Sequence, residues 1–338
     1  MALRTQDPVT RREHPANVAI ECRGNKHIGM LAPTRRLCAF LAVGILLFTF
    51  AAAGGVKLSG VKSWAYQLQN VDPIEIKLSP YDLVAIDYGF DRLNATAFPR
   101  EVVELMRSRP SGNRRLLLAY LNVAEADESR FYWQAKWAQE RPNWLRPTTD
   151  ASGSFLVKYW QPEWQSILYG NADAYLDRIL TAGYDGILVD GAERFEDWKR
   201  TRPTAAAEMI GLISALASYA RGQRGDFLLI PQNGDALLSD AAFLRTIDGF
   251  AREELLYGEK APEARNSHSS IADSVRRLNW VVAAGKPVFV IEYTSDPQLA
   301  ASMLRELRAL GFIGYVADRA LKTLSPPVFG CGQPDCSQ

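Results

Sequence analysis

From residue 60 onward, short apolar runs rich in β-branched residues alternate with longer amphipathic segments. A strand buried on both faces appears in a sequence as a continuous apolar run, whereas a helix that covers a sheet shows a period near 3.6 residues. The alternation therefore predicts repeated βα units. Eight runs fit the strand pattern, at residues 63–69, 82–89, 115–123, 184–190, 227–233, 247–253, 287–293 and 313–319.

The amphipathic segments between these runs begin and end at helix signals. Pro162 opens the longest of them and Gly183 follows its last apolar residue, which predicts a single helix over residues 162–182. The other predicted helices cover residues 98–107, 203–219, 271–284 and 299–310. The longest predicted loop, about residues 122–161, lies between the third and fourth strands, and we expect its tryptophans to pack within it.

Eight βα repeats over about 250 residues are the usual size of a closed barrel. We therefore predict the α/β class, with a (β/α)8 TIM barrel as a single domain over residues 61–324. The alternative is an open, doubly wound sheet. No G-x-G-x-x-G pattern follows the first strand, which disfavours that alternative.

The N-terminal region differs from the rest of the chain in charge. Residues 1–36 carry seven Lys or Arg and three Asp or Glu, and residues 37–56 carry no charge. A basic flank before a long apolar run is typical of an export segment. We expect residues 37–56 to be either the apolar core of a cleaved signal peptide or a membrane anchor. In both cases the body would lie outside the cytoplasm, secreted or periplasmic.

The remaining residues carry 32 basic and 35 acidic side chains. This slightly acidic balance does not favour nucleic-acid binding, which needs clustered Lys and Arg. We expect a monomer. In the C-terminal tail, residues 325–338, the spacing of Cys331 and Cys336 permits a disulfide loop in an oxidising compartment, and two free thiols are the alternative.

Carboxylates are the chemical groups that recur at the predicted strand ends. Barrel enzymes carry their reactive groups at the C-terminal ends of the strands. One such acid is as often a helix cap or an ion-pair partner. Several around one opening raise one another's pKa values, which suits acid/base chemistry or binding of a cation. Six predicted strands carry them, as Asp87, Glu125, Asp190, Glu253 with Glu254, Glu292 and Asp318.

Histidine is scarce, and this narrows the reaction class. The three histidines are His14, His27 and His268, and none follows a predicted strand. A Ser-His-Asp or Cys-His arrangement and a histidine-based zinc site are thereby excluded at the strand ends. Carboxylates alone could hold Mg²⁺ or Ca²⁺, but we expect neither a metal nor an organic cofactor. Glycoside hydrolysis by paired carboxylates is the leading hypothesis.

Aromatic residues near the strand ends suit a sugar substrate, because the C–H faces of pyranose rings stack on aromatic rings. Any one of them could equally be a core residue whose hydroxyl has a local partner. The candidates are Tyr66, Tyr88, Tyr120, Tyr159, Trp160, Tyr257 and Tyr293.

Eight segments together resemble the successive motifs of glycoside hydrolase family 114, the polygalactosaminidase-like barrels. They run in order from about residue 64 to residue 293 and so cover most of the body. Each is weak alone, but the set is specific. The segments are WAYQLQN, DLVAIDYG, LLLAYLNVAEADESRFYW, VKYWQPEWQ, GYDGILVDG, IPQNG, AREELLYG and FVIEY.

The resemblance implies a catalytic Asp at the end of strand four and a catalytic Glu at the end of strand six, here Asp190 and Glu253. A one-residue shift of the motif would move the second role to Glu254. The resemblance also implies endo-acting hydrolysis of α-1,4-linked, galactosamine-containing polymers. Our hypothesis makes Asp190 the nucleophile and Glu253 the general acid/base.

The same hypothesis assigns further residues to substrate binding. The predicted contacts are Asp87, Tyr120, Asn122, Glu125, Tyr159, Asn233, Glu254, Tyr257, Glu292 and Tyr293. Two alternatives stay open: a barrel that binds or processes an amino-sugar polysaccharide with little or no catalysis, and a hydrolase of another amino-sugar polymer.

Overall fold

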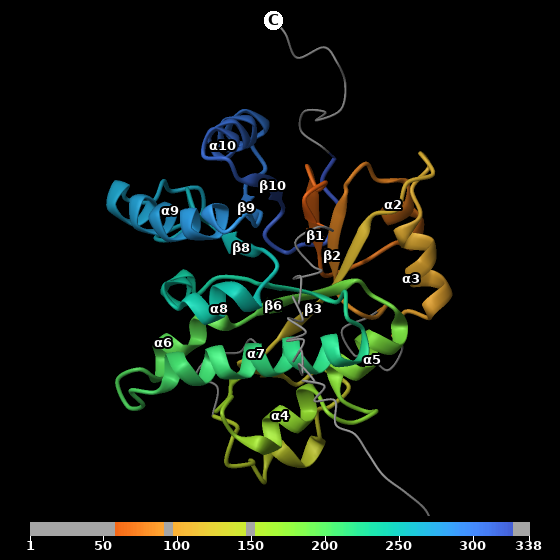
Figure 1. Ribbon diagram of the computed structural model, residues 1–338, viewed down its shortest axis with the longest axis vertical. Helices are drawn as coiled ribbons and strands as arrows, with labels where there is room; N and C mark the ends of the chain where they lie inside the picture. Colours follow the sequence, from red (N-terminus) through yellow and green to blue (C-terminus); the bar gives the residue numbers. More distant parts are fainter. Residues whose placement is uncertain (1–57, 91–96, 147–152, 327–338) are drawn as a thin grey trace, which may run out of the picture. The chain divides into compact units, whose positions relative to one another are not determined.

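The computed structural model describes residues 58–90, 97–146 and 153–326, and eight parallel strands lie at the centre of this body (Figure 1). All eight predicted strands are confirmed. One sheet contains, in spatial order, β1 (Trp64–Gln67), β2 (Leu83–Ile86), β3 (Leu116–Asn122), β6 (Gly186–Asp190) and β7 (Leu228–Pro231). The other contains β10 (Ile313–Ala317), β9 (Val288–Tyr293) and β8 (Phe250–Glu253).

Two seams join these sheets into a barrel. Between β7 and β8, Gln232 forms a parallel bridge with Ala251. At the other seam, the amide of Leu68, just after β1, donates to the carbonyl of Leu321, just after β10, at 3.0 Å. Because both edges are paired, no long sheet edge is left open, and the predicted (β/α)8 barrel is confirmed.

Helices connect the strands along the outside of the barrel (Figure 1). Three predicted helices correspond to α3, α9 and α10, and α7 extends further toward its C-terminus than predicted. The helices are α2 (Pro73–Leu78), α3 (Arg100–Arg107), α4 (Pro162–Leu168), α5 (Tyr175–Ala182), α6 (Phe195–Trp198), α7 (Ala205–Gln223), α8 (Ala241–Thr246), α9 (His268–Ala283) and α10 (Pro297–Ala309). Three short 3-10 turns are η1 (Ala135–Ala138), η2 (Ala192–Arg194) and η3 (Asp235–Ser239).

The single helix predicted over residues 162–182 is wrong, because the structure divides it into α4 and α5. Tyr169 is extended, and Gly170 has a left-handed φ of 99°. The Asn171 side chain then binds backbone groups that a continuous helix would pair with each other. Its Nδ2 donates to the carbonyl of Ser166 at 2.7 Å, and its Oδ1 accepts from the amide of Asp173 at 3.1 Å. Such local bonds offer the chain an alternative to helix.

Apolar and aromatic side chains fill the barrel. Every residue of β1, β2, β7 and β9 is buried. Trp64 of β1 lies 5.4 Å from Phe289 of β9 and 6.1 Å from Tyr315 of β10, measured between ring centroids. These rings pack across the seam between β1 and β10, so aromatic contacts reinforce a seam with few backbone hydrogen bonds.

The long segment between β3 and β6 forms an additional layer. Its strands β4 (Glu125–Asp127) and β5 (Ser154–Leu156) pair antiparallel. The predicted packing of its tryptophans is confirmed: Trp137 lies 5.3 Å from Trp133 and 5.0 Å from Trp144, between ring centroids. The segment thus has its own aromatic core, which holds β4 beside the end of β3.

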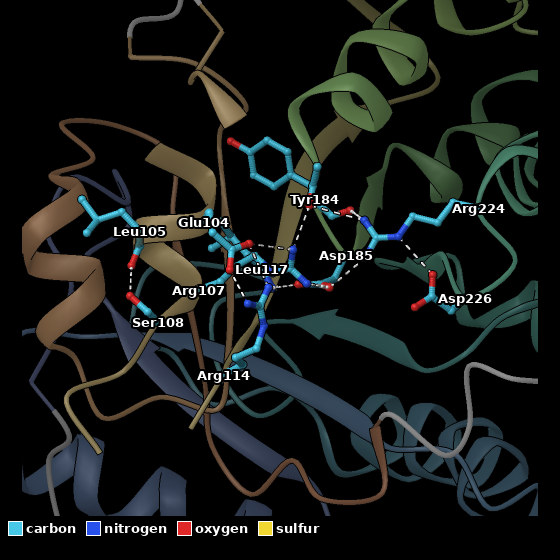
Figure 2. Close-up of polar contacts among 11 residues, drawn as sticks. Glu104, Leu105, Arg107, Ser108, Arg114, Leu117, Tyr184, Asp185, Arg224 and Asp226 are labelled. Carbon is cyan, nitrogen blue, oxygen red and sulfur yellow. Dashed lines mark hydrogen bonds and ion pairs between the residues drawn. The ribbon is translucent and has the colours of Figure 1, made fainter. Parts of the chain in front are cut away.

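An ion-pair network fixes the start of β6, at the end of that strand away from Asp190 (Figure 2). The buried carboxylate of Asp185 binds Arg107 of α3 at 2.5 Å and Arg224, which follows α7, at 3.2 Å. Its second oxygen accepts from the amide of Leu117 in β3 at 3.0 Å. Two helices and two strands are therefore tied together at one carboxylate.

Two features of the sequence lie outside the described residues: the apolar run 37–56 and the pair Cys331 and Cys336. Within residues 58–90, 97–146 and 153–326, no helix is both long and apolar enough to cross a membrane.

Candidate active site

Asp190 ends β6 and accepts hydrogen bonds from neighbouring strands. The Tyr120 hydroxyl of β3 donates to Asp190 Oδ2 at 2.6 Å, and Gln232 Nε2, just after β7, donates to Oδ1 at 3.4 Å. Burial, followed by the charge of Asp190, raises the pKa of Tyr120 well above its ordinary value. Tyr120 therefore keeps its proton and acts as a donor.

Asn122 links Asp190 to Glu125. In the pairing of β3 with β6, Asn122 stands directly opposite Asp190, and its Nδ2 lies 3.3 Å from Asp190 Oδ2 and 3.2 Å from Glu125 Oε2. Gly191 allows this approach, because a Cβ at that position would lie 2.6 Å from Asn122 Oδ1. Glu125 also pairs with Arg194 at 2.7 Å, so its charge is partly compensated.

Glu253 ends β8 and receives two side-chain hydrogen bonds. The Tyr293 hydroxyl donates to its Oε1, and Asn233 Nδ2 donates to its Oε2 at 3.0 Å. Burial, followed by the charge of Asp190, raises the pKa of the Glu253 carboxyl, while these two hydrogen bonds partly oppose the rise. Glu253 thus has the environment of a carboxyl that keeps its proton at higher pH than an ordinary glutamate.

Glu254 takes a different direction from Glu253. Its backbone is left-handed, with a φ of 52°, and its carboxylate pairs with Arg319. The arrangement agrees with the alternation of side chains along a strand, which lets only one of two consecutive residues face the barrel opening.

The barrel interior places Tyr66 near both acids. The side chain is fully buried, and its pKa is raised well above the ordinary value by burial, then by the charges of Asp190 and Glu253. Tyr66 also stacks beside Tyr120, with ring centroids 6.5 Å apart. Asp190 and Glu253 therefore share one environment although they belong to separate sheets.

Three residues predicted to contact substrate are buried and bind protein groups instead. Asp87 is 3% exposed and pairs with Arg130 at 2.7 Å, and burial raises its pKa. The Tyr159 hydroxyl donates to the carbonyl of Ala205 at 2.7 Å. Glu292 is fully buried and accepts from two backbone amides. We leave all three out of the proposed substrate contacts.

Glu292 lies in β9, which pairs with β8. Its Oε1 accepts from the amide of Leu256 at 2.7 Å and its Oε2 from the amide of Tyr257 at 3.2 Å. Burial raises the pKa of Glu292 to about 7, and the two amide hydrogen bonds oppose this rise. Glu292 thereby fixes the loop that follows β8, and Tyr257 in that loop stays partly exposed.

Sequence reasoning missed Gln232, Arg194 and Glu193. Glu193 lies in η2, three residues after Asp190, and burial followed by the charge of Asp190 raises its pKa. Its Oε2 is buried and has no hydrogen-bond partner among the described residues. For Glu193 and Arg194 the signal is the segment VDGAER, in which they follow Asp190 by three and four residues.

A small pocket opens beside Asp190, between the end of β3 and the β4–β5 hairpin. Its walls combine tyrosine rings with carboxylate, amide and guanidinium groups. It is lined by Tyr120, Asn122, Glu125, Asp127, Arg130, Tyr132, Ser154 and Tyr175. No group of three or more His, Cys, Asp or Glu suited to a metal ion occurs in the described ranges.

A (β/α)8 barrel with two acids at the C-terminal ends of its strands has the arrangement of a glycoside hydrolase. The profile of glycoside-hydrolase family GH114 matches residues 47–332. The chain therefore belongs to this family and is a glycoside hydrolase.

The chain is also similar to curated relatives and to solved structures. The chain is 36% identical over 275 residues to an uncharacterized protein of Deinococcus radiodurans, covering 79% of this chain and 83% of the relative. It is 32% identical over 279 residues to one of Methanocaldococcus jannaschii, covering 78% of each. The structure is similar to the glycoside hydrolase domain of PelA from Pseudomonas aeruginosa, with a TM-score of 0.59 and 19% identity, covering 78% of this chain and 97% of that domain. At this identity the last likeness concerns the fold.

Proposed function

We propose that this enzyme cleaves α-1,4-linked, galactosamine-containing exopolysaccharide, with Asp190 as nucleophile and Glu253 as general acid/base. The observation that carries the proposal is the contrast between the two acids. Burial beside Asp190 raises the pKa of Glu253, as a proton donor requires, while Asp190 accepts from several donors, which suits a carboxylate.

Each carboxyl then has a defined task. Glu253 donates its proton to the glycosidic oxygen as the bond to the anomeric carbon breaks, and Asp190 attacks that carbon to form a glycosyl-enzyme. The Glu253 carboxylate next takes a proton from water, whose oxygen displaces Asp190. Two displacements give net retention at the anomeric carbon. Release of a product with the inverted configuration would contradict the role of Asp190 as nucleophile.

The charge around Asp190 supports an amine-bearing substrate. Burial and the charge of Asp190 raise the pKa values of Glu125 and Glu193, Glu125 adds to the rise at Glu193, and Arg194 opposes both shifts. An ammonium group bound here would relieve the repulsion between the carboxylates. We expect Tyr120, Asn122 and Glu125 to contact the sugar beside Asp190, and Asn233, Tyr257 and Tyr293 to contact it beside Glu253.

Product sizing tests the reaction. The purified protein is incubated with galactosamine polymers and, separately, with glucosamine polymers, and chain lengths are measured. We expect the galactosamine polymer to be shortened. A barrel that only binds the polymer would leave chain length unchanged, and preferential shortening of the glucosamine polymer would assign the enzyme to another amino sugar.

Substitutions then test the roles. Asp190→Asn and Glu253→Gln should each lower kcat/KM by about 10²–10⁴-fold, the usual range for such groups, with unchanged thermal unfolding. Glu196→Gln is the matched control, because this half-exposed acid of α6 pairs with Lys199 and should leave activity unchanged. A larger loss in Glu254→Gln than in Glu253→Gln would move the acid/base role by one residue.

We also propose that the barrel functions outside the cytoplasm. The support is the basic segment 1–36 followed by the uncharged run 37–56. Fractionation of cells expressing the full chain should place the protein in the periplasm, the medium or the outer face of a membrane. Recovery only from the cytosol would contradict this proposal.

A further inference from the structure

Glu254 has an unusual backbone that its neighbours hold in place. A φ of 52° is uncommon for a residue with a side chain. Asn266 Nδ2 donates to the carbonyl of Glu254 at 2.8 Å and to that of Leu255 at 3.0 Å, which fixes the turn. Gly258 leaves room for the carboxylate, because a Cβ there would lie 1.9 Å from Glu254 Oε1. The local chain is thus built around one position of this carboxylate.

Arg319 connects Glu254 to the catalytic acid. Arg319 follows β10, and its guanidinium forms an ion pair with Glu254. The same guanidinium carbon lies 5.1 Å from the centroid of the Tyr293 ring. Tyr293 in turn donates its hydroxyl to Glu253. Ion pair, ring and hydrogen bond therefore form a continuous series of contacts that ends at the proposed general acid.

Fold stability gives little reason for this arrangement. The side chain of Arg319 is 52% exposed and that of Glu254 is 25% exposed, and solvent-accessible ion pairs contribute little to stability. The left-handed backbone at Glu254 is itself unfavourable. A costly conformation that holds a weakly stabilising pair beside a catalytic acid points to a role in the reaction.

Several charged or titratable groups act on Glu253. Glu254 raises the pKa of Glu253, and the positive charge of Arg319 acts in the opposite direction. Arg252, on the same strand, donates instead to Asn233 Oδ1 at 3.1 Å. The charged and titratable groups around Glu253, from the neighbouring elements, are Asp190 of β6, Tyr66 of β1, Tyr293 of β9, Arg252, Glu254 and Arg319.

We propose that Glu254 and Arg319 are positioning residues that hold the Tyr293 hydroxyl on Glu253 and, as a compensated pair, set how readily Glu253 releases its proton. The proposal rests on the proposed function, in which Glu253 is the general acid. It does not make either residue part of the reacting group. It assigns the pair a joint effect, because Glu254 alone would raise the proton affinity of Glu253 and Arg319 alone would lower it.

The pH dependence of kcat/KM separates this role from a structural one. The alkaline limb reports the essential acid of the free enzyme. Glu254→Gln should move this limb down by about 0.5 pH unit and Arg319→Met should move it up by about the same amount, as expected for one partly exposed charge. The double variant should return to within about 0.2 pH unit of the wild type.

A distant ion pair supplies the control. Arg276 and Asp273 of α9 pair at 3.0 Å and are both exposed, so Arg276→Met and Asp273→Asn should leave the limb in place. Shifts of the same sign in Glu254→Gln and Arg319→Met, or an unchanged limb in both, would overturn the proposal. Thermal unfolding of each variant identifies any loss that comes from misfolding.

A second measurement needs no turnover. Infrared difference spectra of wild type and Glu253→Gln isolate the carboxyl band of Glu253, and its titration is followed in the Glu254→Gln and Arg319→Met backgrounds. The midpoints should shift in opposite directions. If the wild type does not hydrolyse the polymer, the proposed function fails, and these titrations still decide the effect of the pair. Coincident midpoints would overturn it.

Discussion

At the scale of residues, Glu253 and Glu292 have the same side chain in neighbouring strands but contact different groups. Glu253 binds side-chain donors and lies in the field of Asp190. Glu292 accepts from two backbone amides of the loop after β8 and is fully buried. The same carboxyl group is therefore placed for the proposed reaction at Glu253 and for loop structure at Glu292, because the neighbours differ.

Tyr293 should influence the proton of Glu253 directly. In Tyr293→Phe the hydroxyl that lowers the pKa of Glu253 is lost, so this pKa should rise and the alkaline limb of kcat/KM should move to higher pH. We also expect a loss of about tenfold in kcat/KM, the cost of one misaligned hydrogen bond. Tyr169→Phe, on the loop between α4 and α5, is the control and should match the wild type. A limb that moves to lower pH would contradict the prediction.

Glu292 should make the fold less stable as pH rises. Its pKa is about 7 in the folded protein against an ordinary value of 4.5, so the folded state binds more protons between these values. The contribution of Glu292 to the free energy of unfolding is therefore fully present below about pH 4.5. It decreases toward pH 7, by up to about 1.4 kcal/mol per pH unit.

Denaturant unfolding at several pH values measures this effect. Glu292→Gln should flatten the decrease in stability with pH, and it should cost about 1–3 kcal/mol at low pH, because the amide nitrogen that replaces one oxygen cannot accept from the backbone N–H of Leu256 or Tyr257. The exposed Glu259→Gln should keep the wild-type slope. An unchanged slope in Glu292→Gln would refute the assignment of the titrating group.

At the scale of elements, the approach of β7 to β6 depends on a glycine. A Cβ at Gly186 would lie 2.3 Å from the carbonyl oxygen of Leu228 in β7. Gly186→Ala should therefore destabilise the protein by about 2–4 kcal/mol, because backbone cannot move aside as a flexible side chain can. Gly211, in the middle of α7, has open space, so Gly211→Ala should stabilise it by about 0.5–1 kcal/mol. Equal effects on the midpoint of urea unfolding would contradict both expectations.

The break between α4 and α5 shows what periodicity misses at this scale. Apolar spacing and the Gly183 stop signal continue across residues 169–174, so the pattern predicts one helix. Gly170 and the side chain of Asn171 end α4 through local hydrogen bonds that do not alter the apolar spacing.

At the scale of the whole molecule, closure of the barrel depends on Gln67. This residue is fully buried at the end of β1, and its Nε2 donates to the carbonyls of Gln69 at 3.0 Å and Lys322 at 3.1 Å. Gln67→Ala should lower the free energy of unfolding by about 1–3 kcal/mol, because it removes the donor to two partly buried carbonyls that lie on either side of the seam. Gln69→Ala removes a more exposed bond to Ala320 and should cost less than about 1 kcal/mol. Similar losses in the two variants would argue against closure through Gln67.

The sequence by itself determined the barrel and a set of candidate acids at its strand ends. Eight apolar runs separated by amphipathic segments admit few other arrangements, since parallel strands must be covered by helices on the outside. Strand ends of a barrel meet at one opening, so the runs placed acids from six strands there, and the family resemblance singled out Asp190 and Glu253 among them. Scarcity of histidine excluded most other chemistries for the same positions.

Only the tertiary structure decided which acids face one another and which are occupied elsewhere. Burial of Asp87 against Arg130 and of Glu292 against backbone amides depends on neighbours distant in the chain. Likewise, the left-handed turn at Glu254 and its pairing with Arg319 join residues separated by most of two βα units. A one-dimensional pattern records how often a residue type recurs, whereas the proton affinity of a carboxyl depends on charges and dipoles brought near it by folding.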